Sequence, residues 1–469
     1  MGKPLFINFT VMNTPSHLTH GTWRKPGSRS TEYNTLDLWV DIAKLAEKNK
    51  IDAIFFADVI GLWESQSGDW GKMARLAVQF PVSEPAVLLS AMAHATKNLG
   101  FMYTSSIFAA NPFIFSRTIS TLDHVTNGRI AWNVVTGASK NGARSQGLPD
   151  IKDHDQRYAI ADEYIDVTYK LWESSWDPEA VVKNPGSGPR DGSFAYADPA
   201  KVHKIHHKGE RYSCEGPHLV EPSPQRVPVI VQAGSSGAGT VFAGKHAEAV
   251  FTIAGTVEGA KKRYDAVLVA AEKQGRRKED IHFIEGITVI VAETDEAARA
   301  KEAEYESWVS DEAHALMYGG ATGVDLSTVD PEMPLDELIK IMPGMHGVVS
   351  LVSSAIKNRK PIVRDVLHNS AKGYRVVGSP TTVADRLEEF VAAGATGFNI
   401  LTMGIPDTFE DFCKFVAPEL RKRGLMREEY TPGTLREKMF PGQGPWVNER
   451  HAAHSYRYRF KDDGAVKTD

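Results

Sequence analysis

The chain has 469 residues, of which 42% are hydrophobic and 24% charged, a composition typical of a folded globular protein. Its 54 basic and 59 acidic residues leave a net charge of −5, so charge gives no reason to expect binding to nucleic acid or an anionic membrane. The two cysteines, Cys214 and Cys413, lie far apart, and no apolar run reaches the roughly 18 residues of a membrane helix. The N-terminus lacks the pattern of a signal peptide, so we expect a soluble, cytoplasmic protein.

The first half of the chain alternates predicted strands with predicted helices. Nearly continuous apolar runs predict strands at 4–11, 51–58, 99–106 and 129–136. Helices are predicted at 34–50, 83–97, 111–128 and 158–174. The second of these helices begins at a Ser83 cap, and the third has proline at its start and glycine at its end.

The second half resumes the same alternation. Strands are predicted at 227–234, 248–255, 281–293 and 397–404, with helices at 238–247, 256–275, 381–395 and 408–424. Eight buried strands alternating with helices indicate an α/β fold with a parallel sheet, and we expect a (β/α)8 TIM barrel. Two doubly wound halves are the alternative architecture.

Three stretches interrupt the alternation, at 59–82, 176–226 and 310–378. The alternation resumes after each, so we expect insertions into a single barrel spanning 1–424 rather than separate domains. The remaining residues, 425–469, are polar and are expected to pack on the outside of the barrel as a tail.

The predicted strands end in polar residues, which matters because barrel enzymes carry their active sites at the carboxyl ends of their strands. These residues are Asn13 with His17, Asp58, Thr104-Ser105-Ser106, Asn133 with Thr136, Gly234-Ser235-Ser236, and Thr402. Any one of them alone is more often a turn or capping residue. Together around one rim they predict a polar pocket with few charges.

The residues that several common enzyme mechanisms require are absent from this sequence. There is no suitable carboxylate pair for glycoside hydrolysis, no P-loop and no GXSXG motif. The histidines of "HKIHH" (203–207) fall in a predicted hairpin, and we interpret them as surface residues rather than a metal site. A bound cofactor that carries the chemistry is the remaining option.

The stretch "AGSSGAGTVFAGKHA" (233–247) supports a bound cofactor. A strand ends at Gly234, small residues turn the chain, and a helix begins, which leaves backbone N–H groups free to bind a phosphate. A glycine-rich turn with no ligand is the alternative interpretation.

Six long motifs are spread over almost the whole chain: "DAIFFADV", "STLDHVTNGRIAWNVVT", "HDQRYAIADEY", "DPAKVHKIHHKGERY", "PHLVEPSPQRVPVIVQAGSS" and "YGGATGVDLS". In these motifs the sequence resembles the flavin-dependent monooxygenases of the bacterial-luciferase superfamily. Within that superfamily it looks like the branch of nitrilotriacetate, dibenzothiophene-sulfone and long-chain alkane monooxygenases, most of all the last.

The resemblance implies a two-component system in which a separate flavin reductase supplies FMNH2. The chain would react this flavin with O2, and the resulting flavin peroxide or hydroperoxide would oxygenate a small organic substrate. It also implies a homodimer or homotetramer, with the helix at 85–95 as a candidate interface.

The resemblance also implies roles for individual residues. The flavin ring would contact Asp58, Thr104, Ser105, Asn133, Thr136 and Gly137, and the phosphate would contact Tyr158, Gly234, Ser235 and Ser236. His17 and Gln79 match catalytic positions on the substrate side, where His17 would donate a proton or orient the substrate; a loop-capping role is the alternative. Family members often carry a non-prolyl cis peptide near the end of the third strand, here 104–106.

The substrate side departs from the alkane enzymes. Where the alkane enzymes have a cysteine after the first strand, this chain has Thr14, and where they have a tyrosine after the second strand it has Trp63. Their histidine after "NVVT" is replaced by Gly137-Ala138, and their histidine before "YGG" is replaced by Met317. An indole and small residues in place of imidazoles suit a larger, flatter substrate, so we expect an aromatic or heterocyclic compound. A riboflavin lyase-type enzyme, a long-chain alkane hydroxylase, a deazaflavin-dependent enzyme and an inactive flavin-binding protein are the alternatives.

Overall fold

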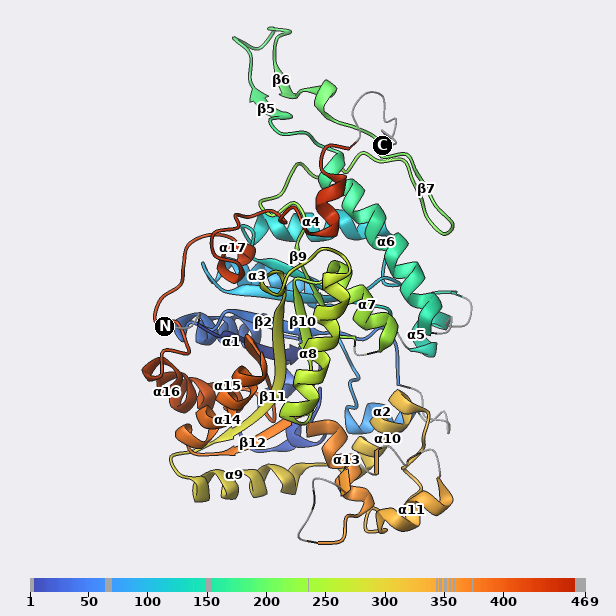
Figure 1. Ribbon diagram of the computed structural model, residues 1–469, viewed down its shortest axis with the longest axis vertical. Helices are drawn as coiled ribbons and strands as arrows, with labels where there is room; N and C mark the ends of the chain where they lie inside the picture. The colour runs from blue at the N-terminus through green and yellow to red at the C-terminus, as the bar shows by residue number, and fades with distance from the viewer. Residues whose placement is uncertain are drawn as a thin grey trace.

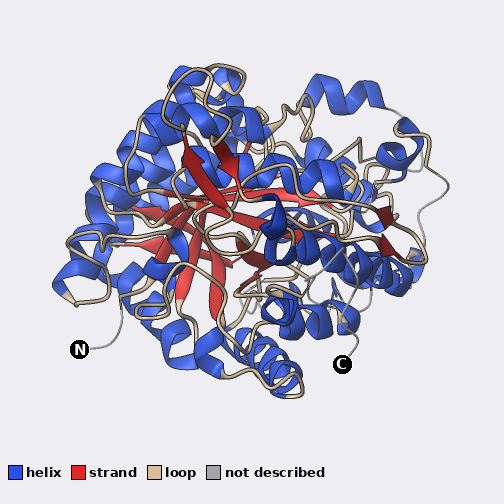
Figure 2. Cartoon of the chain, turned by 90° about the horizontal axis from the view of Figure 1, so that it is seen from above, coloured by secondary structure: helices blue, strands red, loops and turns tan. Residues whose placement is uncertain are grey.

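The computed structural model describes residues 4–63, 70–137, 139–148, 154–234, 236–342, 345, 348–349, 352–353, 356, 359–372 and 374–459. Eight parallel strands form its centre: β1 (Phe6–Met12), β2 (Ala53–Ala57), β3 (Gly100–Ser106), β4 (Ile130–Val135), β9 (Val229–Gln232), β10 (Ala249–Thr252), β11 (His282–Val291) and β13 (Gly397–Leu401). β10 pairs with β11, and β13 pairs with β1, so the sheet closes on itself. The predicted (β/α)8 barrel is confirmed, with all eight predicted strands in place (Figure 2).

The α-helices surround the strands, as Figures 1 and 2 show. They are α1 (Leu36–Lys48), α2 (Trp70–Leu76), α3 (Pro85–His94), α4 (Pro112–Val125), α5 (Lys140–Ser145), α6 (His154–Ser174), α7 (Gly237–His246), α8 (Val257–Glu272), α9 (Asp295–Trp308), α10 (Asp311–Thr322), α11 (Leu335–Ile341), α13 (Val363–Lys372), α14 (Pro380–Ala393), α15 (Asp407–Asp411), α16 (Ala417–Lys422) and α17 (Leu435–Met439). Short 3-10 turns lie at Thr22–Arg24, Ser30–Glu32, Pro199–Lys201, Lys278–Asp280 and Ala452–Tyr456 (η7), and a π-helical turn at Phe412–Val416 joins α15 to α16.

Two details of the predicted elements were wrong. Helix α3 is capped by Glu84, whose carboxylate accepts a hydrogen bond from Ala86 N at 3.0 Å, and not by Ser83. Pro85 occupies the first helical position, which shifts the cap one residue along the chain. A strand that the alternation did not reveal, β12 (Tyr374–Gly378), pairs with the carboxyl half of β11 because β11 extends beyond the barrel.

Alternate residues of each strand face the inside of the barrel. At the amino ends of the strands this interior is apolar, with Phe6, Phe55 and Met102 among its buried side chains. One layer higher it becomes polar: Asn8 Nδ2 donates to Asn399 Oδ1 at 2.7 Å, and Asn133 Nδ2 donates to Thr104 Oγ1 at 2.9 Å. This change explains the asparagines within otherwise apolar strands, and it places polar groups just below the carboxyl rim.

The segment that follows α16 closes the amino end of the barrel. Leu435, Met439 and Phe440 pack against the apolar interior side chains. Arg436 forms a buried, two-pronged ion pair with Glu248 at the start of β10, at 2.7 and 2.8 Å.

The insertions differ in how far they pack on the barrel. The hairpin of β5 (Val181–Asn184) and β6 (Ala195–Ala197) projects away from the body of the molecule at the top of Figure 1. A second hairpin, β7 (His207–Lys208) with β8 (Ser213–Cys214), is the one predicted around "HKIHH". Helices α10, α11 and α13 share a small hydrophobic core of their own. Within the described residues, no helix combines the length and apolarity needed to cross a bilayer.

Candidate active site

A cavity of about 730 Å³ lies where β1, β2, β3, β4 and β9 end. This volume falls in the range of small-molecule and cofactor sites. The cavity brings together many residues singled out in the sequence: His17, Asp58, Trp63, Gln79, Thr136, Gly137, Tyr158, Gly234 and Met317. They come from segments far apart in the chain, and only the closing of the barrel makes them neighbours.

Four other predicted residues lie near the cavity but do not line it. Thr14 donates its hydroxyl hydrogen bond to Pro81 O at 2.7 Å, and it lines a much smaller neighbouring cavity. Thr104 and Asn133 pair with each other inside the barrel. Ser236 caps α7 by accepting a hydrogen bond from Gly239 N at 3.0 Å. Ala138 and Ser235 lie outside the described residues.

The Ser105 side chain points away from the interior of the barrel and from the cavity. Its side chain hydrogen-bonds with Tyr103, on the same outward face of β3, and its carbonyl accepts from Trp132 Nε1 at 3.0 Å. Ser106, one residue further, lines the cavity. The reason is the two-residue period of a strand, which allows only one of two successive serines to face inward.

One end of the cavity is lined by the residues that lead from β9 toward α7, Gln232, Ala233 and Gly234. Gln232 Nε2 donates to the Tyr158 hydroxyl at 3.1 Å. A Cβ at Gly234 would come within 3 Å of both of these side chains, so glycine is needed for them to approach the backbone here. Arg157 is held beside this end by its hydrogen bond to Gly137 O at 2.6 Å.

Arg157 and Gln232 were not selected from the sequence, although both line the cavity. Arg157 lies directly before Tyr158 in the motif "HDQRYAIADEY", and Gln232 is the last residue of β9. Gln232 could have been found from the sequence, because a polar residue at the end of a barrel strand indicates a place in the active site. Arg211 and Tyr212, from the β7–β8 hairpin, also line the cavity, and no local pattern indicates this.

Three residues that line the cavity carry a buried polar atom with no hydrogen-bond partner among the described residues. The atoms are His17 Nδ1, Arg157 Nε and Gln232 Oε1. Buried polar atoms are nearly always hydrogen-bonded in native proteins, so such atoms beside a cavity indicate a ligand that supplies the partners. Burial also lowers the pKa of His17 to about 4, so this imidazole is neutral at neutral pH.

Asp58, at the end of β2, is the carboxyl group on the cavity wall. Burial, and secondarily the nearby negative charge of Glu84, raises the pKa of Asp58 to about 7. Glu84 is itself fixed by the Tyr103 hydroxyl, which donates to it at 3.0 Å. Near neutral pH the Asp58 side chain can therefore donate a hydrogen bond as well as accept one.

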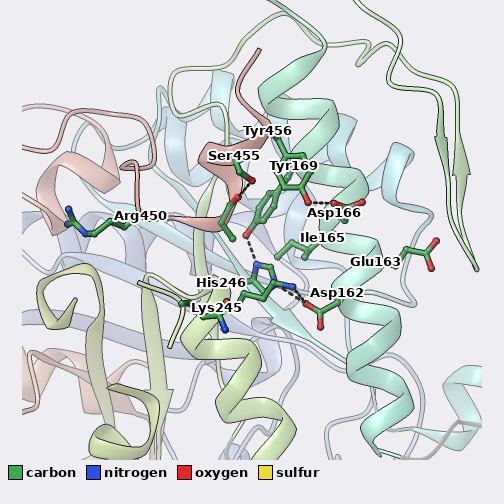
Figure 3. A pocket seen from close by; sticks show the side chains of 12 residues that line it. Asp162, Glu163, Ile165, Asp166, Tyr169, Lys245, His246, Arg450, Ser455 and Tyr456 are labelled. Atoms are coloured by element: carbon green, nitrogen blue, oxygen red, sulfur yellow. Dashed lines mark hydrogen bonds and ion pairs between the residues drawn. The ribbon is translucent and has the colours of Figure 1, made fainter. Parts of the chain in front are cut away.

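A second cavity, of about 390 Å³, lies between α6, α7 and η7 (Figure 3). Asp162 of α6 accepts from both Lys245 and His246 of α7, at 2.9 and 3.0 Å, and the Tyr169 hydroxyl is 3.2 Å from the other His246 nitrogen. Tyr456 donates to Asp166. The other charged groups here also have protein partners: Arg450 pairs with Asp280, and Glu163 lies 3.5 Å from His207. These charges are already balanced by protein groups, so the cavity at the strand ends is the better candidate.

The interpretation of the "HKIHH" histidines as surface residues was wrong for two of them. His203 and His207 are buried, and they lie 3.1 Å from Asp177 and 3.5 Å from Glu163, respectively. The cis peptide bonds in the described part of the chain all precede prolines, so the non-prolyl cis bond that is frequent in the family is not found at 104–106.

Comparisons with known proteins agree with this geometry. Residues 17–397 match the family described as luciferase-like monooxygenase. A long-chain alkane monooxygenase of Geobacillus thermodenitrificans is 41% identical over 460 residues, which is 97% of this chain and 99% of that protein. The chain belongs to the luciferase-like monooxygenase family, and it is a flavin-dependent oxidoreductase.

Two solved structures are similar over nearly the full length. DmoA from Hyphomicrobium sulfonivorans gives a TM-score of 0.90 at 38% identity, covering 98% of this chain and 97% of its own. A riboflavin lyase, solved with modified FMN and its substrate riboflavin, gives a TM-score of 0.85 at 32% identity, covering 97% of this chain and 100% of its own. The predicted resemblance is thereby confirmed.

The cavity residues fit a flavin nucleotide. The cradle at Gly234 and Tyr158, with the Arg157 cation beside it, suits a phosphate at the N-terminus of α7. The unpartnered Gln232 oxygen suits an N–H or hydroxyl donor of the rest of such a molecule.

Proposed function

We propose that this chain is the oxygenase of a two-component system that uses FMNH2 from a separate reductase, and O2, to oxygenate a small aromatic or heterocyclic compound. The supporting observation is a single cavity with a phosphate cradle at one end and Trp63, Met317 and Gly137 on its walls. When bound, reduced FMN supplies the electrons that activate O2.

The protein residues have three roles in this proposal. Tyr158, Arg157 and the start of α7 hold the phosphate, and Asp58 and Thr136 face the flavin ring. Neutral His17 orients the substrate or passes a proton at its unpartnered Nδ1. The apolar walls exclude bulk water, which would otherwise divert the reduced flavin to hydrogen peroxide release.

A flavin-degrading activity is the second candidate. The supporting observation is the structural similarity to riboflavin lyase over nearly the full chain. Riboflavin is also large and flat, and the residues that replace those of the alkane enzymes at Trp63 and Gly137 favour a substrate of that shape.

The test supplies photoreduced FMN to the purified chain under 18O2, with dibenzothiophene sulfone, riboflavin, dimethyl sulfide and 1-decanol as separate candidate substrates. We expect one flat compound to gain a single 18O atom, detected by mass spectrometry, while hydrogen peroxide release falls. Cleavage of riboflavin would favour the second candidate. Full conversion of O2 to hydrogen peroxide with every compound would contradict both.

A further inference from the structure

Gln79 links two loops of the cavity wall through a single side chain. Its Oε1 accepts a hydrogen bond from the Trp63 indole Nε1 at 2.8 Å, and its Nε2 donates to His17 O at 2.8 Å. Both ends of the amide are therefore engaged. Gln79 is buried, and its φ of 46° is a left-handed conformation that a non-glycine residue adopts only when its surroundings hold it.

The segment that carries Gln79 is itself attached to the loop after β1. Val78 N donates to Met73 O at 3.0 Å, and Ser83 N donates to Asn13 O at 2.9 Å. Thr14 adds a hydrogen bond to Pro81 O. The left-handed backbone at Gln79 is thus fixed on both sides, and the amide has little freedom to reorient.

Trp63 is confined on its other sides as well. Leu62, the residue before it, donates its N–H to Asn141 Oδ1 at 3.0 Å and accepts from Ser139 Oγ at 2.9 Å. A Cβ at Gly320 of α10 would come within 3 Å of the Trp63 Cβ and backbone, so α10 packs directly behind it. The indole is therefore fixed at its nitrogen by Gln79 and at its base by α10.

We propose that Gln79 is a positioning residue: it holds the Trp63 indole as a rigid flat wall, and this wall selects flat substrates over linear ones. This inference rests on the proposed function for the identity of the cavity. Rigid aromatic surfaces bind flat rings by stacking at little entropic cost, whereas a linear chain gains less from the same surface. In this proposal Gln79 acts through Trp63 and the His17 loop, in place of the direct catalytic role that the resemblance implied.

The test measures binding rather than turnover. Equilibrium dialysis of FMN-loaded, oxidised enzyme gives the dissociation constants of a flat probe, dibenzothiophene sulfone, and a linear probe, 1-decanol. We expect the wild type to prefer the flat probe by about tenfold or more, and Trp63→Leu to lose most of that preference. Trp63→Phe keeps a flat ring and should retain most of it.

Gln79→Met removes both hydrogen bonds at similar volume. We expect this substitution to weaken binding of the flat probe about fivefold and to leave binding of 1-decanol nearly unchanged. In a protein that already carries Trp63→Leu it should have no further effect on either affinity. Gln274→Met, the same change outside this cavity, is the control. Equal preference for the two probes in the wild type, or additive effects of the two substitutions, would overturn the proposal.

Trp63 fluorescence separates positioning from a general structural effect. The anisotropy assigned to Trp63, taken as the difference between the wild type and Trp63→Phe, should fall in Gln79→Met. It should recover in Gln79→Glu, which keeps an oxygen for the indole N–H. Because no step requires O2, failure of this inference is distinguishable from failure of the oxygenase proposal, which the 18O experiment reports.

Discussion

Asp58 shows how an ordinary strand-end carboxylate acquires unusual properties from its surroundings. Its pKa is raised from 3.8 to about 7, first by burial and then by Glu84. A folded-state pKa above the unfolded value means that the folded protein binds the proton more tightly. Asp58 therefore costs stability progressively as the pH rises from about 4 to about 7, and the cost stays constant above that.

Asp58→Asn should remove this pH dependence. We expect the melting temperature of the variant to rise relative to the wild type as the pH increases from about 4 to 7, with no further change at higher pH. Thermal unfolding of both proteins across this range is the measurement. Glu84→Gln should show the same trend more weakly, because burial is the larger cause; a difference that does not change with pH would contradict the raised pKa.

At the candidate site, the sequence around a single residue does not specify which way its side chain points or which partners it takes. The period of β3 predicts that only one of Ser105 and Ser106 faces inward, but which one does so depends on the register of the strand in the barrel. Likewise, nothing local to Gln79 indicates that Trp63 and His17 take both ends of its amide. Such contacts depend on loops whose backbone conformation sequence patterns do not specify.

At the scale of elements, the junction between β9 and α7 is the part of the site on which the flavin assignment depends most. Gly234→Ala places a methyl group within 3 Å of Gln232 and Tyr158 and should fill the phosphate cradle. We expect FMN affinity to fall at least about tenfold and riboflavin affinity much less, since riboflavin lacks the phosphate. Fluorescence titrations with the two flavins measure the difference.

Gly188→Ala, between β5 and β6, is the control, because a Cβ at Gly188 meets no atom within 4 Å. Gly188 does not line the cavity, so the variant reports any general effect of replacing a glycine by alanine. Equal losses for FMN and riboflavin in Gly234→Ala would indicate that this junction does not hold the phosphate.

At the scale of the whole molecule, the cavity and the apolar cluster that closes the barrel lie at opposite ends of the strands. The cavity is at the carboxyl ends, whereas α17 fills the amino end with Leu435, which is 1% exposed. Active-site loops can therefore vary without disturbing the apolar interior below them.

Leu435→Ala tests this separation. We expect it to destabilise the fold by about 2–5 kcal/mol, because it removes a fully buried leucine and leaves a cavity. FMN affinity should change less than about threefold. Urea unfolding gives the free energy of unfolding, and fluorescence titration gives the FMN dissociation constant. Leu36→Ala is the control, because Leu36 is half-exposed on α1. A large loss of FMN affinity at unchanged stability would contradict the placement of the flavin site at the carboxyl ends of the strands.

Local sequence patterns are enough to define the barrel and its strand-end rim. Long apolar runs such as those of β1 and β3, alternating with capped helices, leave few architectures that bury them, so these patterns alone locate the eight strands. The motif after β9 likewise places the start of α7, because a glycine-rich turn followed by a capping serine is a local signal.

Which side chains meet depends on the tertiary structure. The folded chain places Glu84 beside Asp58, joins Trp63 to His17 through Gln79, brings Arg211 to the cavity from a hairpin, and places α17 inside the barrel end. β12 is not evident in the sequence because its pairing depends on how far β11 extends beyond the barrel. Local patterns encode the elements through short-range physics, whereas these contacts depend on long-range packing and on the conformations of loops.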